Sequence, residues 1–396
     1  MSNQADLPVD FTHAQEFIDP LLTKAIDSGV SDLHFERLGE DGVVRVRADG
    51  MMREWIRLPM EQMNLVISRL KFISGVDPML TGALQQSRFT HNYSGGEVDM
   101  RVSVLPTPNM EDMVIRILSS KPEVMKIDNM GLQPYILDDL KKAVQAHTGL
   151  ILVTGPTGSG KTTTLYSLID TVNDNSRKII TVEDPIEYKV DGLTQVKLEH
   201  DRGLDYAAIL KTILRHDPDV ILVGETRDLS AAEIAVESSM TGHLVLTTLH
   251  TNSAPATILR LINMGVPAVD VSNAVTALYA QRLIKKLCPD CKKEAPVSDE
   301  MAAYMKEHMA DQSTPQTVHI PVGCPACDNT GYKGRAPIGE LLVMNDDIRD
   351  VIYKNATLNS LGEAAKQAGM KPMKYNGVLL VLDGLAHFDD IVRTVG

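Results

Sequence analysis

The apolar residues in the first third of the chain alternate with polar ones over short runs, as they do in strands with one buried face. Turn sequences that contain Gly or Asp-Gly separate these runs and predict antiparallel hairpins. A helix is expected between two of the hairpins, from Glu61 to about Ser74. The strands are expected over residues 32–38, 43–48, 51–58, 97–105 and 113–118. These elements predict a small α+β domain with a mixed, half-exposed sheet.

The chain before the first of these strands shows two patterns. Residues 1–16 are polar and have no clear period, so we expect a loose arm there. A helix is predicted to open with Asp19 as its N-cap and Pro20 in its first turn, and to stop at Gly29. Proline suits the first turn of a helix and glycine its end.

A different pattern begins after the polar break at residues 119–123. Continuous apolar runs, typical of strands that are buried on both faces, alternate with helical segments. The strands are expected over residues 150–153, 179–182, 220–223 and 244–248, and the helices over 135–146, 162–172, 206–214 and 231–240. This alternation predicts a parallel sheet covered by helices on both faces, that is, an α/β domain.

We place the domain boundary near residue 128, which divides the chain into an N-terminal domain (1–128) and a second domain (129–396). Within the second domain, residues 285–335 contain every cysteine of the chain and are expected to form a metal-binding subdomain. Residues 337–396 predict a helical C-terminal subdomain. Its helices are expected over residues 346–354 and 358–368 and around Val378 and Ile391.

Composition narrows the possible functions. The 52 acidic residues outnumber the 39 basic ones, so the 396-residue chain has a net charge of −13. A general binder of nucleic-acid backbones has the opposite balance, and we expect no nucleic-acid partner. The sequence has no apolar run of about eighteen residues and no basic-then-apolar start. We therefore expect a cytoplasmic protein that reaches a membrane only through partners.

A phosphate-binding loop of the type G-x-x-x-x-G-K-[ST] lies between the predicted strand 150–153 and the helix that follows. Inward-pointing backbone N–H groups and the helix N-terminus would hold the phosphates of ATP. Lys161 would reach the β- and γ-phosphates, and the Thr162 hydroxyl would ligate Mg²⁺. The predicted nucleotide-binding residues are Gly155, Pro156, Thr157, Gly158, Ser159, Gly160, Lys161, Thr162 and Thr163. The alternative is a glycine-rich turn without a ligand, which the flanking strand and helix disfavour.

Two acidic residues follow neighbouring predicted strands and are candidate catalytic groups. Glu183 opens the sequence Glu-Asp-Pro-Ile-Glu after strand 179–182, where it can accept a proton from the water that attacks the γ-phosphate. The alternative is a solvated Asp-Pro turn. Glu225 follows strand 220–223 one residue past a glycine, so we expect it to contact Mg²⁺ through water.

Two histidines, His243 and His250, bracket the predicted strand 244–248. A single histidine is more often a hydrogen-bonded structural residue than a catalytic one. Their position in a chain that already has a phosphate loop and carboxylates makes both of them catalytic candidates.

The cysteines form two Cys-Pro-x-Cys pairs, Cys288 with Cys291 and Cys324 with Cys327, separated by 32 residues. This spacing is typical of a closed, structural four-thiolate Zn²⁺ site. One alternative is a redox-active cysteine pair, although that chemistry needs one reactive pair and the sequence has two matched pairs. Another is a zinc ribbon that binds nucleic acid, but no aromatic residues interleave with the lysines nearby.

The phosphate loop, the acidic box at Glu183, the segment around Glu225, the histidine box and the cysteine pairs occur in one order. In that order they resemble the secretion ATPase superfamily, and more narrowly the motors of type IV pilus assembly and type II secretion. The resemblance starts near Phe17. Two of its segments, Ala25–Glu36 and Arg101–Thr107, are similar to the PAS-like domain that precedes the ATPase core in this superfamily.

The resemblance implies a PAS-like domain followed by a RecA-like core that hydrolyses ATP. It also implies a homohexameric ring that moves pilins through an inner-membrane platform protein. Retraction motors of the superfamily typically lack the four cysteines, so the resemblance favours assembly or secretion. The alternatives are a retraction motor, a RecA-like nucleic-acid translocase, and a scaffold that binds ATP without hydrolysing it.

The resemblance also implies a role for Arg101 and Arg116 in the first domain, which it places against the nucleotide when that domain closes on the core. The alternative is two arginines on a solvent-facing side of the sheet. The sequence departs from the family pattern at residues 109–112, so the loop before Arg116 is expected to bend differently. Larger relatives have an additional N-terminal domain, which the segment before Phe17 is too short to supply.

Overall fold

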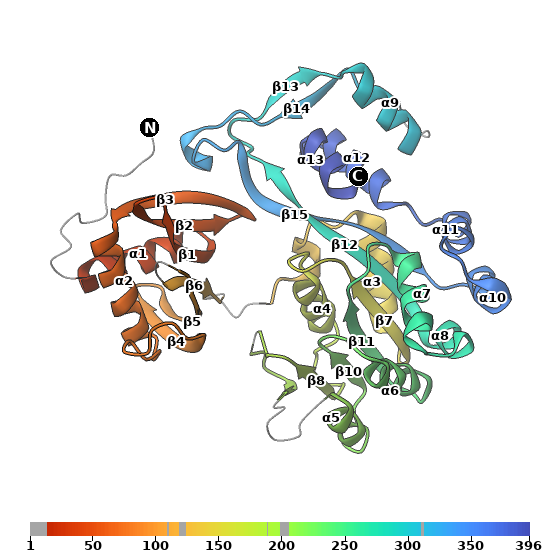
Figure 1. Cartoon of the computed structure of the whole chain (residues 1–396). Helices are drawn as coiled ribbons and strands as arrows, with labels where there is room; N and C mark the ends of the chain where they lie inside the picture. The colour runs from red at the N-terminus through yellow and green to blue at the C-terminus, as the bar shows by residue number, and fades with distance from the viewer. Residues whose placement is uncertain (1–13, 109–110, 119–123, 188, 199–205, 310–312) are drawn as a thin grey trace. The chain divides into compact units, whose positions relative to one another are not determined.

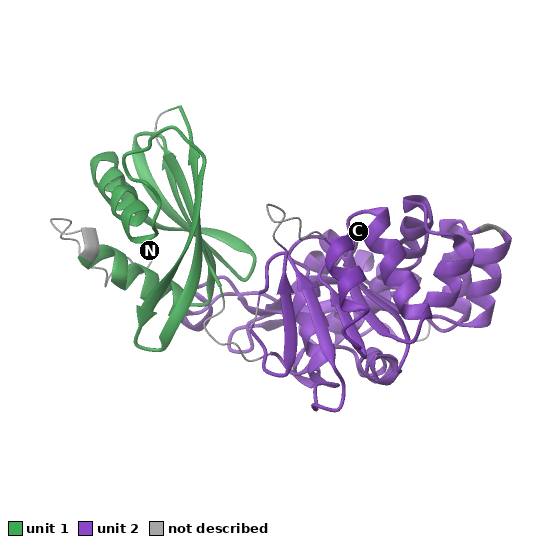
Figure 2. Cartoon of the chain, turned by 90° about the horizontal axis from the view of Figure 1, so that it is seen from below, with its two compact units in different colours: residues 1–122 green, residues 123–396 purple. Residues whose placement is uncertain are grey.

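The computed structural model describes residues 14–108, 111–118, 124–187, 189–198, 206–309 and 313–396 (Figure 1). The chain divides into two compact units, residues 1–122 and residues 123–396 (Figure 2). The predicted break at 119–123 and residues 1–13 of the arm predicted over 1–16 lie outside the described residues, whereas residues 14–16 belong to a helix and not to an arm. Each unit has its own hydrophobic core and is described by itself.

The described part of the first unit is a six-stranded sheet in the order β3-β2-β1-β6-β5-β4. All of its strand pairs are antiparallel, so the expectation of a mixed sheet was wrong. Alternate residues of β5, such as Val98, Met100 and Val102, face a core that includes residues of α1 and α2. Strand alternation therefore sets which face of the sheet is buried. The elements are α1 (Ala14–Asp27), β1 (Val30–Leu38), β2 (Asp41–Ala48), β3 (Met51–Pro59), α2 (Met60–Ile73), β4 (Gln85–Tyr93), β5 (Gly96–Pro106) and β6 (Glu111–Ile117).

The start of the first helix was predicted wrongly. Helix α1 already includes Ala14, and Pro20 lies inside it, so Asp19 is not its N-cap. The reason is packing, because Phe17 and Ile18 are buried on the same core as Leu21. Burial of two large apolar side chains outweighs the backbone hydrogen bond that an internal proline removes.

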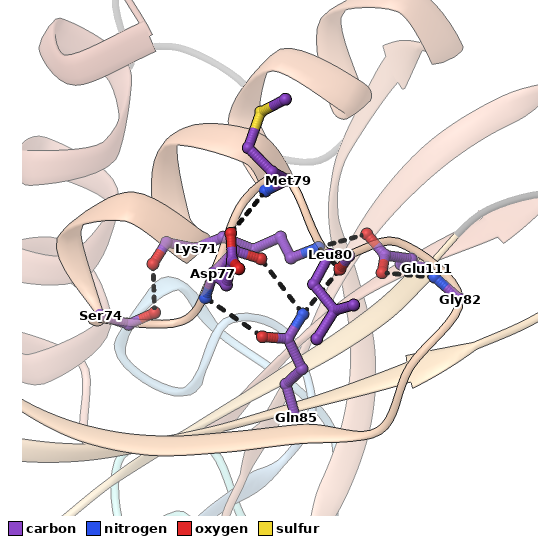
Figure 3. Close-up of polar contacts among 8 residues, drawn as sticks. All are labelled: Lys71, Ser74, Asp77, Met79, Leu80, Gly82, Gln85 and Glu111. Carbon is purple, nitrogen blue, oxygen red and sulfur yellow. Dashed lines mark hydrogen bonds and ion pairs between the residues drawn. The ribbon is translucent and has the colours of Figure 1, made fainter.

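A buried ion pair holds the loop between α2 and β4 (Figure 3). Lys71 is 1% exposed, and its Nζ donates to Glu111 Oε2 at 2.7 Å and to the Leu80 carbonyl at 3.0 Å. The other oxygen of Glu111 accepts a hydrogen bond from the backbone N–H of Gly82. Gln85 also donates to the Leu80 carbonyl. This network fixes a loop that contributes few buried apolar side chains.

The described part of the second unit is built on a seven-stranded sheet in the order β15-β12-β7-β11-β10-β8-β9. Six strands are parallel, the four that were predicted together with β9 and β12, but β15 runs antiparallel to β12. The sheet is therefore mixed. The strands are β7 (Gly149–Thr154), β8 (Ile179–Glu183), β9 (Leu193–Lys197), β10 (Val220–Val223), β11 (Leu244–Leu249), β12 (Val275–Leu287) and β15 (Tyr332–Val343).

Alternate residues of the central strand β7 face two different cores. Leu150 and Leu152 pack with α5, α6 and α7, whereas Ile151 and Val153 pack with α3 and α4. Helices thus cover both faces, as the α/β pattern predicted. These helices are α3 (Pro134–Gln145), α4 (Lys161–Asp170), α5 (Tyr206–Ile213), α6 (Leu229–Met240), α7 (Ala254–Met264) and α8 (Ala268–Ala274).

The cysteine-containing subdomain connects β12 to β15, and four helices follow β15. Strand β12 ends at Leu287, directly before the first cysteine. Within the described residues no helix is long and apolar enough to cross a membrane. The remaining elements are β13 (Lys293–Pro296), α9 (Asp299–His308), β14 (Thr317–Ile320), α10 (Asp346–Asn355), α11 (Leu358–Gln367), α12 (Met373–Leu382) and α13 (Phe388–Val395).

The ion pair of the first unit leads to a prediction. Glu111→Ala leaves the buried charge of Lys71 without its partner, which should lower the free energy of unfolding of this unit by about 3–5 kcal/mol. Trp55 is the single tryptophan of the chain and lies in β3, so urea unfolding followed by its fluorescence reports on this unit. The control is Glu363→Ala, which removes an exposed ion pair with Lys366 and should have no measurable effect. An unchanged midpoint for Glu111→Ala would contradict this account.

Candidate functional site

A glycine-rich loop joins the carboxyl end of β7 to the N-terminus of α4. Gly155, Gly158 and Gly160 all have positive φ angles (+147°, +78° and +86°), which side-chain-bearing residues rarely adopt. A Cβ atom on Gly155 would also lie 2.2 Å from the Gln281 carbonyl oxygen. The glycines therefore permit both the curl of the loop and its close approach to β12.

Lys161 is the first residue of α4 and lies across this loop. Its Nζ donates to the carbonyls of Gly155 (2.9 Å) and Pro156 (3.1 Å). Burial lowers the pKa of Lys161, and the negative charge of Glu225 opposes that shift. The loop thus holds one partly buried cation where a phosphate chain would be bound.

Glu183 is the last residue of β8 and is 3% exposed. Its carboxylate accepts hydrogen bonds from the Tyr166 hydroxyl (2.7 and 2.8 Å) and from Thr181 Oγ1 (2.6 Å). Gln195 donates to the same Tyr166 hydroxyl. Burial first, and then the neighbouring Glu183, raise the pKa of Tyr166 far above its ordinary value. Tyr166 therefore remains a hydrogen-bond donor that orients the carboxylate.

Glu225 follows β10 and forms two contacts at the same edge of the sheet. Its oxygens lie 2.8 Å from a terminal nitrogen of Arg227 and 3.0 Å from His250 Nε2. Burial favours protonation of Glu225, but the hydrogen bond and charge of Arg227 and the charge of His250 outweigh it and lower the pKa. Arg227 also lies 3.8 Å from Asp184. The sequence analysis assigned no role to Arg227, although it lies only two residues after Glu225.

The two candidate histidines lie at opposite ends of β11. His250 follows the strand at the edge where the phosphate loop lies, and it contacts Glu225. His243 precedes the strand, and its Nδ1 lies 2.9 Å from the Ser238 carbonyl. The fold therefore brings His250, but not His243, to the phosphate loop of the same chain.

These groups line one cavity of about 710 Å³ in the second unit. The loop forms one wall, and Glu183, Glu225 and His250 line the cavity as well. Leu283 of β12 and Arg335 of β15 also line it. Neither residue was a candidate from the sequence, because neither strand was predicted. A cavity with a glycine loop, a cation and two carboxylates has the groups needed to bind and hydrolyse a nucleoside triphosphate.

Arg101 and Arg116 belong to the first unit, where they are directly opposite each other on β5 and β6. Arg88 of β4 is opposite Arg101 on its other side, so three arginines cross the sheet in one row. Arg116 Nε donates to Asp32 Oδ1 at 2.8 Å. Burial raises the pKa of Asp32, but the bonds from Arg116 and Ser31 outweigh it and lower the pKa overall. Arg88 was missed because its position opposite Arg101 is set only by the pairing of β4 with β5.

The four cysteine sulfurs form a compact cluster in which all Sγ atoms lie within 4.8 Å of one another. Three of the Sγ pairs are 3.8–3.9 Å apart, far beyond a disulfide bond. Tetrahedral Zn²⁺ with Zn–S bonds of about 2.3 Å places its sulfurs about 3.8 Å apart. Backbone N–H groups of Gly323 and Gly331 point at Cys291 Sγ (3.3 Å) and Cys327 Sγ (3.2 Å). Such donors stabilise thiolates, so the residues fit structural zinc.

Comparison with known proteins agrees with this geometry. The family described as "Type II/IV secretion system protein" matches residues 9–393. The type IV pilus assembly ATPase PilB of Myxococcus xanthus is 39% identical over 378 residues, which cover 95% of this chain and 67% of that protein. The putative type II secretion system protein E of Escherichia coli is 38% identical over 376 residues, with coverage of 95% and 76%.

Solved structures show the same similarity. The pilus retraction motor PilT with bound ADP matches with a TM-score of 0.63 and 28% identity, over 95% of this chain and 96% of that one. The ATPase DotB of Legionella pneumophila matches with a TM-score of 0.72 and 21% identity, over 99% and 98%. The α/β fold predicted from the sequence is thereby confirmed.

The cysteine cluster leads to a second prediction. Cys288→Ser should release zinc, because a closed four-thiolate site needs all of its ligands, and it should leave ADP binding intact, because such a site has no open catalytic position. Metal content of the purified full chain by mass spectrometry, with ADP titration, checks both parts. Asp290→Ala changes an exposed residue between two ligands and is the control. Wild-type protein without zinc, purified without chelator or oxidant, would contradict the assignment.

Proposed function

This chain belongs to the type II/IV secretion system protein family, an ATP-hydrolysing family, and we propose that it is the motor of a type IV pilus assembly or type II secretion machine. The observation that carries the proposal is the cavity that unites the phosphate loop with Glu183, Glu225 and His250. Assembly or secretion is favoured over retraction by the four-cysteine cluster. The net charge of −13 disfavours a nucleic-acid translocase.

The loop residues 155–160 and Lys161 bind the phosphates of ATP in this proposal, and the Thr162 hydroxyl holds Mg²⁺. Mg²⁺ neutralises the charge of the phosphates during their transfer. Glu225 supports the metal through water and is itself held by Arg227 and His250. These contacts fix the direction of the Glu225 carboxylate before the nucleotide binds.

Glu183 takes the proton of the attacking water. Its hydrogen bonds from Tyr166 and Thr181 support this role because they hold the carboxylate in one orientation. A base that is already oriented loses little free energy when the water becomes aligned. His243 is not part of the proposed catalytic set.

The arginine row of the first unit supplies further positive charge. We infer that Arg101 and Arg116 approach the γ-phosphate when the first unit closes on a nucleotide-binding unit, and Arg88 extends the same row. Asp32 orients Arg116 for this contact. Closure coupled to transition-state stabilisation would convert hydrolysis into movement.

The assembly around this chain is also part of the proposal. A homohexameric ring in the cytoplasm, attached to the membrane through an inner-membrane platform protein, would transmit these movements to pilins. The lack of a membrane-crossing helix among the described residues is compatible with attachment through a partner. A structural Zn²⁺ ion held by the four cysteines would stabilise residues 285–335.

Lys161→Ala tests the proposed activity. It should abolish ATP hydrolysis and leave the melting temperature unchanged, because Lys161 is a charge for phosphate and not a core residue. Phosphate release and thermal unfolding of the full chain measure the two effects. Lys366→Ala, on an exposed helix face, is the matched control. The proposal fails if Lys161→Ala still turns over at saturating ATP.

Glu183→Gln tests the proposed base. It should retain ADP affinity and lower kcat by about two to four orders of magnitude, the range expected for loss of a general base. Nucleotide titration and phosphate release separate binding from turnover. Glu237→Gln changes an exposed acid on α6 and should have no effect. Reduced affinity with unchanged turnover per bound ATP would make Glu183 a binding residue instead.

A further inference from the structure

Gln281 of β12 is a buried polar residue that none of the motifs includes. It is 1% exposed, and both ends of its amide contact the phosphate loop and the helix that follows. Nε2 donates to the Ser159 carbonyl at 2.6 Å, and Oε1 accepts a hydrogen bond from Thr164 Oγ1 at 2.7 Å. The orientation of the amide is determined, because only its NH₂ group can donate to a carbonyl.

The bond to Ser159 controls which way one peptide group points. In a trans peptide the C=O and the following N–H point in opposite directions. When Gln281 holds the Ser159 carbonyl away from the loop interior, the N–H of Gly160 points into it. Gly160 has φ +86° and no Cβ, so the backbone here is unusually free to rotate. A rotated peptide would present an oxygen, and not an N–H, to a phosphate.

The same stretch of β12 contacts the loop at two further places. The Gln281 carbonyl oxygen lies 2.2 Å from the position that a Cβ of Gly155 would take, so the strand also lies against the other end of the loop. Leu283 side-chain carbons would lie 3.6 Å from a Cβ on Gly160. Arg282 lies between Gln281 and Leu283 in the strand and donates a hydrogen bond to Asn252 Oδ1 at 3.2 Å. Asn252 is the second residue after His250. Three consecutive residues of β12 thus support both the phosphate loop and the segment after β11.

We propose that Gln281 is a positioning residue for phosphate binding, which keeps the Ser159–Gly160 peptide turned so that its N–H faces the phosphates. This inference rests on the proposed function, since it assigns a role within the nucleotide site. Gln281 does not contact the nucleotide. It acts through the loop, and its removal should weaken nucleotide binding even where the fold remains intact.

The first test compares Gln281→Leu with Asn376→Leu in the full chain. Asn376 is an equally buried amide whose Nδ2 donates to the Gly339 carbonyl at 2.7 Å, in the same unit but outside the phosphate loop. Both variants leave a buried carbonyl without a donor, so both should lower the melting temperature. Only Gln281→Leu should raise the Kd for Mg·ADP, by about tenfold or more, as measured by isothermal titration calorimetry.

The second variant, Gln281→Glu, keeps the shape of the side chain and carries the test if Gln281→Leu does not fold. An ionised carboxyl cannot donate to the Ser159 carbonyl, whereas a protonated one can. Burial raises the pKa of such a carboxyl. The loss of Mg·ADP affinity relative to wild type should therefore be larger at pH 8 than at pH 6. The melting temperature of Gln281→Glu at the two pH values shows how much of this change comes from the stability of the fold.

The outcomes separate this inference from the proposed function. If wild-type protein does not bind Mg·ADP, the proposed function fails. If wild type binds and the folded Gln281 variants bind within about twofold of it at both pH values, the positioning role is overturned. A tenfold loss in the Gln281 variants, with unchanged affinity in Asn376→Leu, supports the role.

Discussion

The second unit depends on one backbone constraint, which is that a loop binding phosphate must turn several N–H groups inward. Each inward N–H sends a neighbouring carbonyl outward, where it needs a donor if it is buried. Gln281 supplies this donor to the Ser159 carbonyl. The loop can keep its shape only because β12 lies directly beside β7.

This requirement links the loop to more distant parts of the same unit. Strand β12 continues from Gln281 to Leu287 and so reaches the first cysteine of the sulfur cluster. Its antiparallel partner β15 contains Glu340, a buried carboxylate that accepts the backbone N–H groups of Ala254 and Met373. These are the first residues of α7 and α12, so one acid holds two helices against the strand pair. The strand pair thereby connects the loop, the cysteine cluster and the C-terminal helices.

Charge at the carboxyl edge of the sheet is balanced locally. Parallel strands end at the same edge, which brings together acids that are far apart in sequence. Glu183 is held by neutral donors, whereas Glu225 is held by Arg227 and His250. The two carboxylates therefore have different surroundings within one cavity, and this difference supports different proposed roles.

The amino-acid sequence by itself determined the features that depend on neighbouring residues. The phosphate loop, the acids that end β8 and β10, and the paired cysteines are recognisable because their spacing along the chain is what their chemistry requires. The burial of one face in the first sheet and of both faces in the second also followed from the sequence, since residue alternation records it. The antiparallel strand β15 did not follow from the sequence.

Only the tertiary structure decided which distant residues meet. The start of α1 was set by the burial of Phe17 against the first sheet and not by its proline. Gln281 and Arg335 lie on strands whose pairing could not be predicted from any local pattern. The direction of β11 beside β7 places His250, and not His243, at the edge of the sheet where the phosphate loop lies. Contacts of this kind form between residues brought together by packing, so they leave no signal in the spacing of a single sequence.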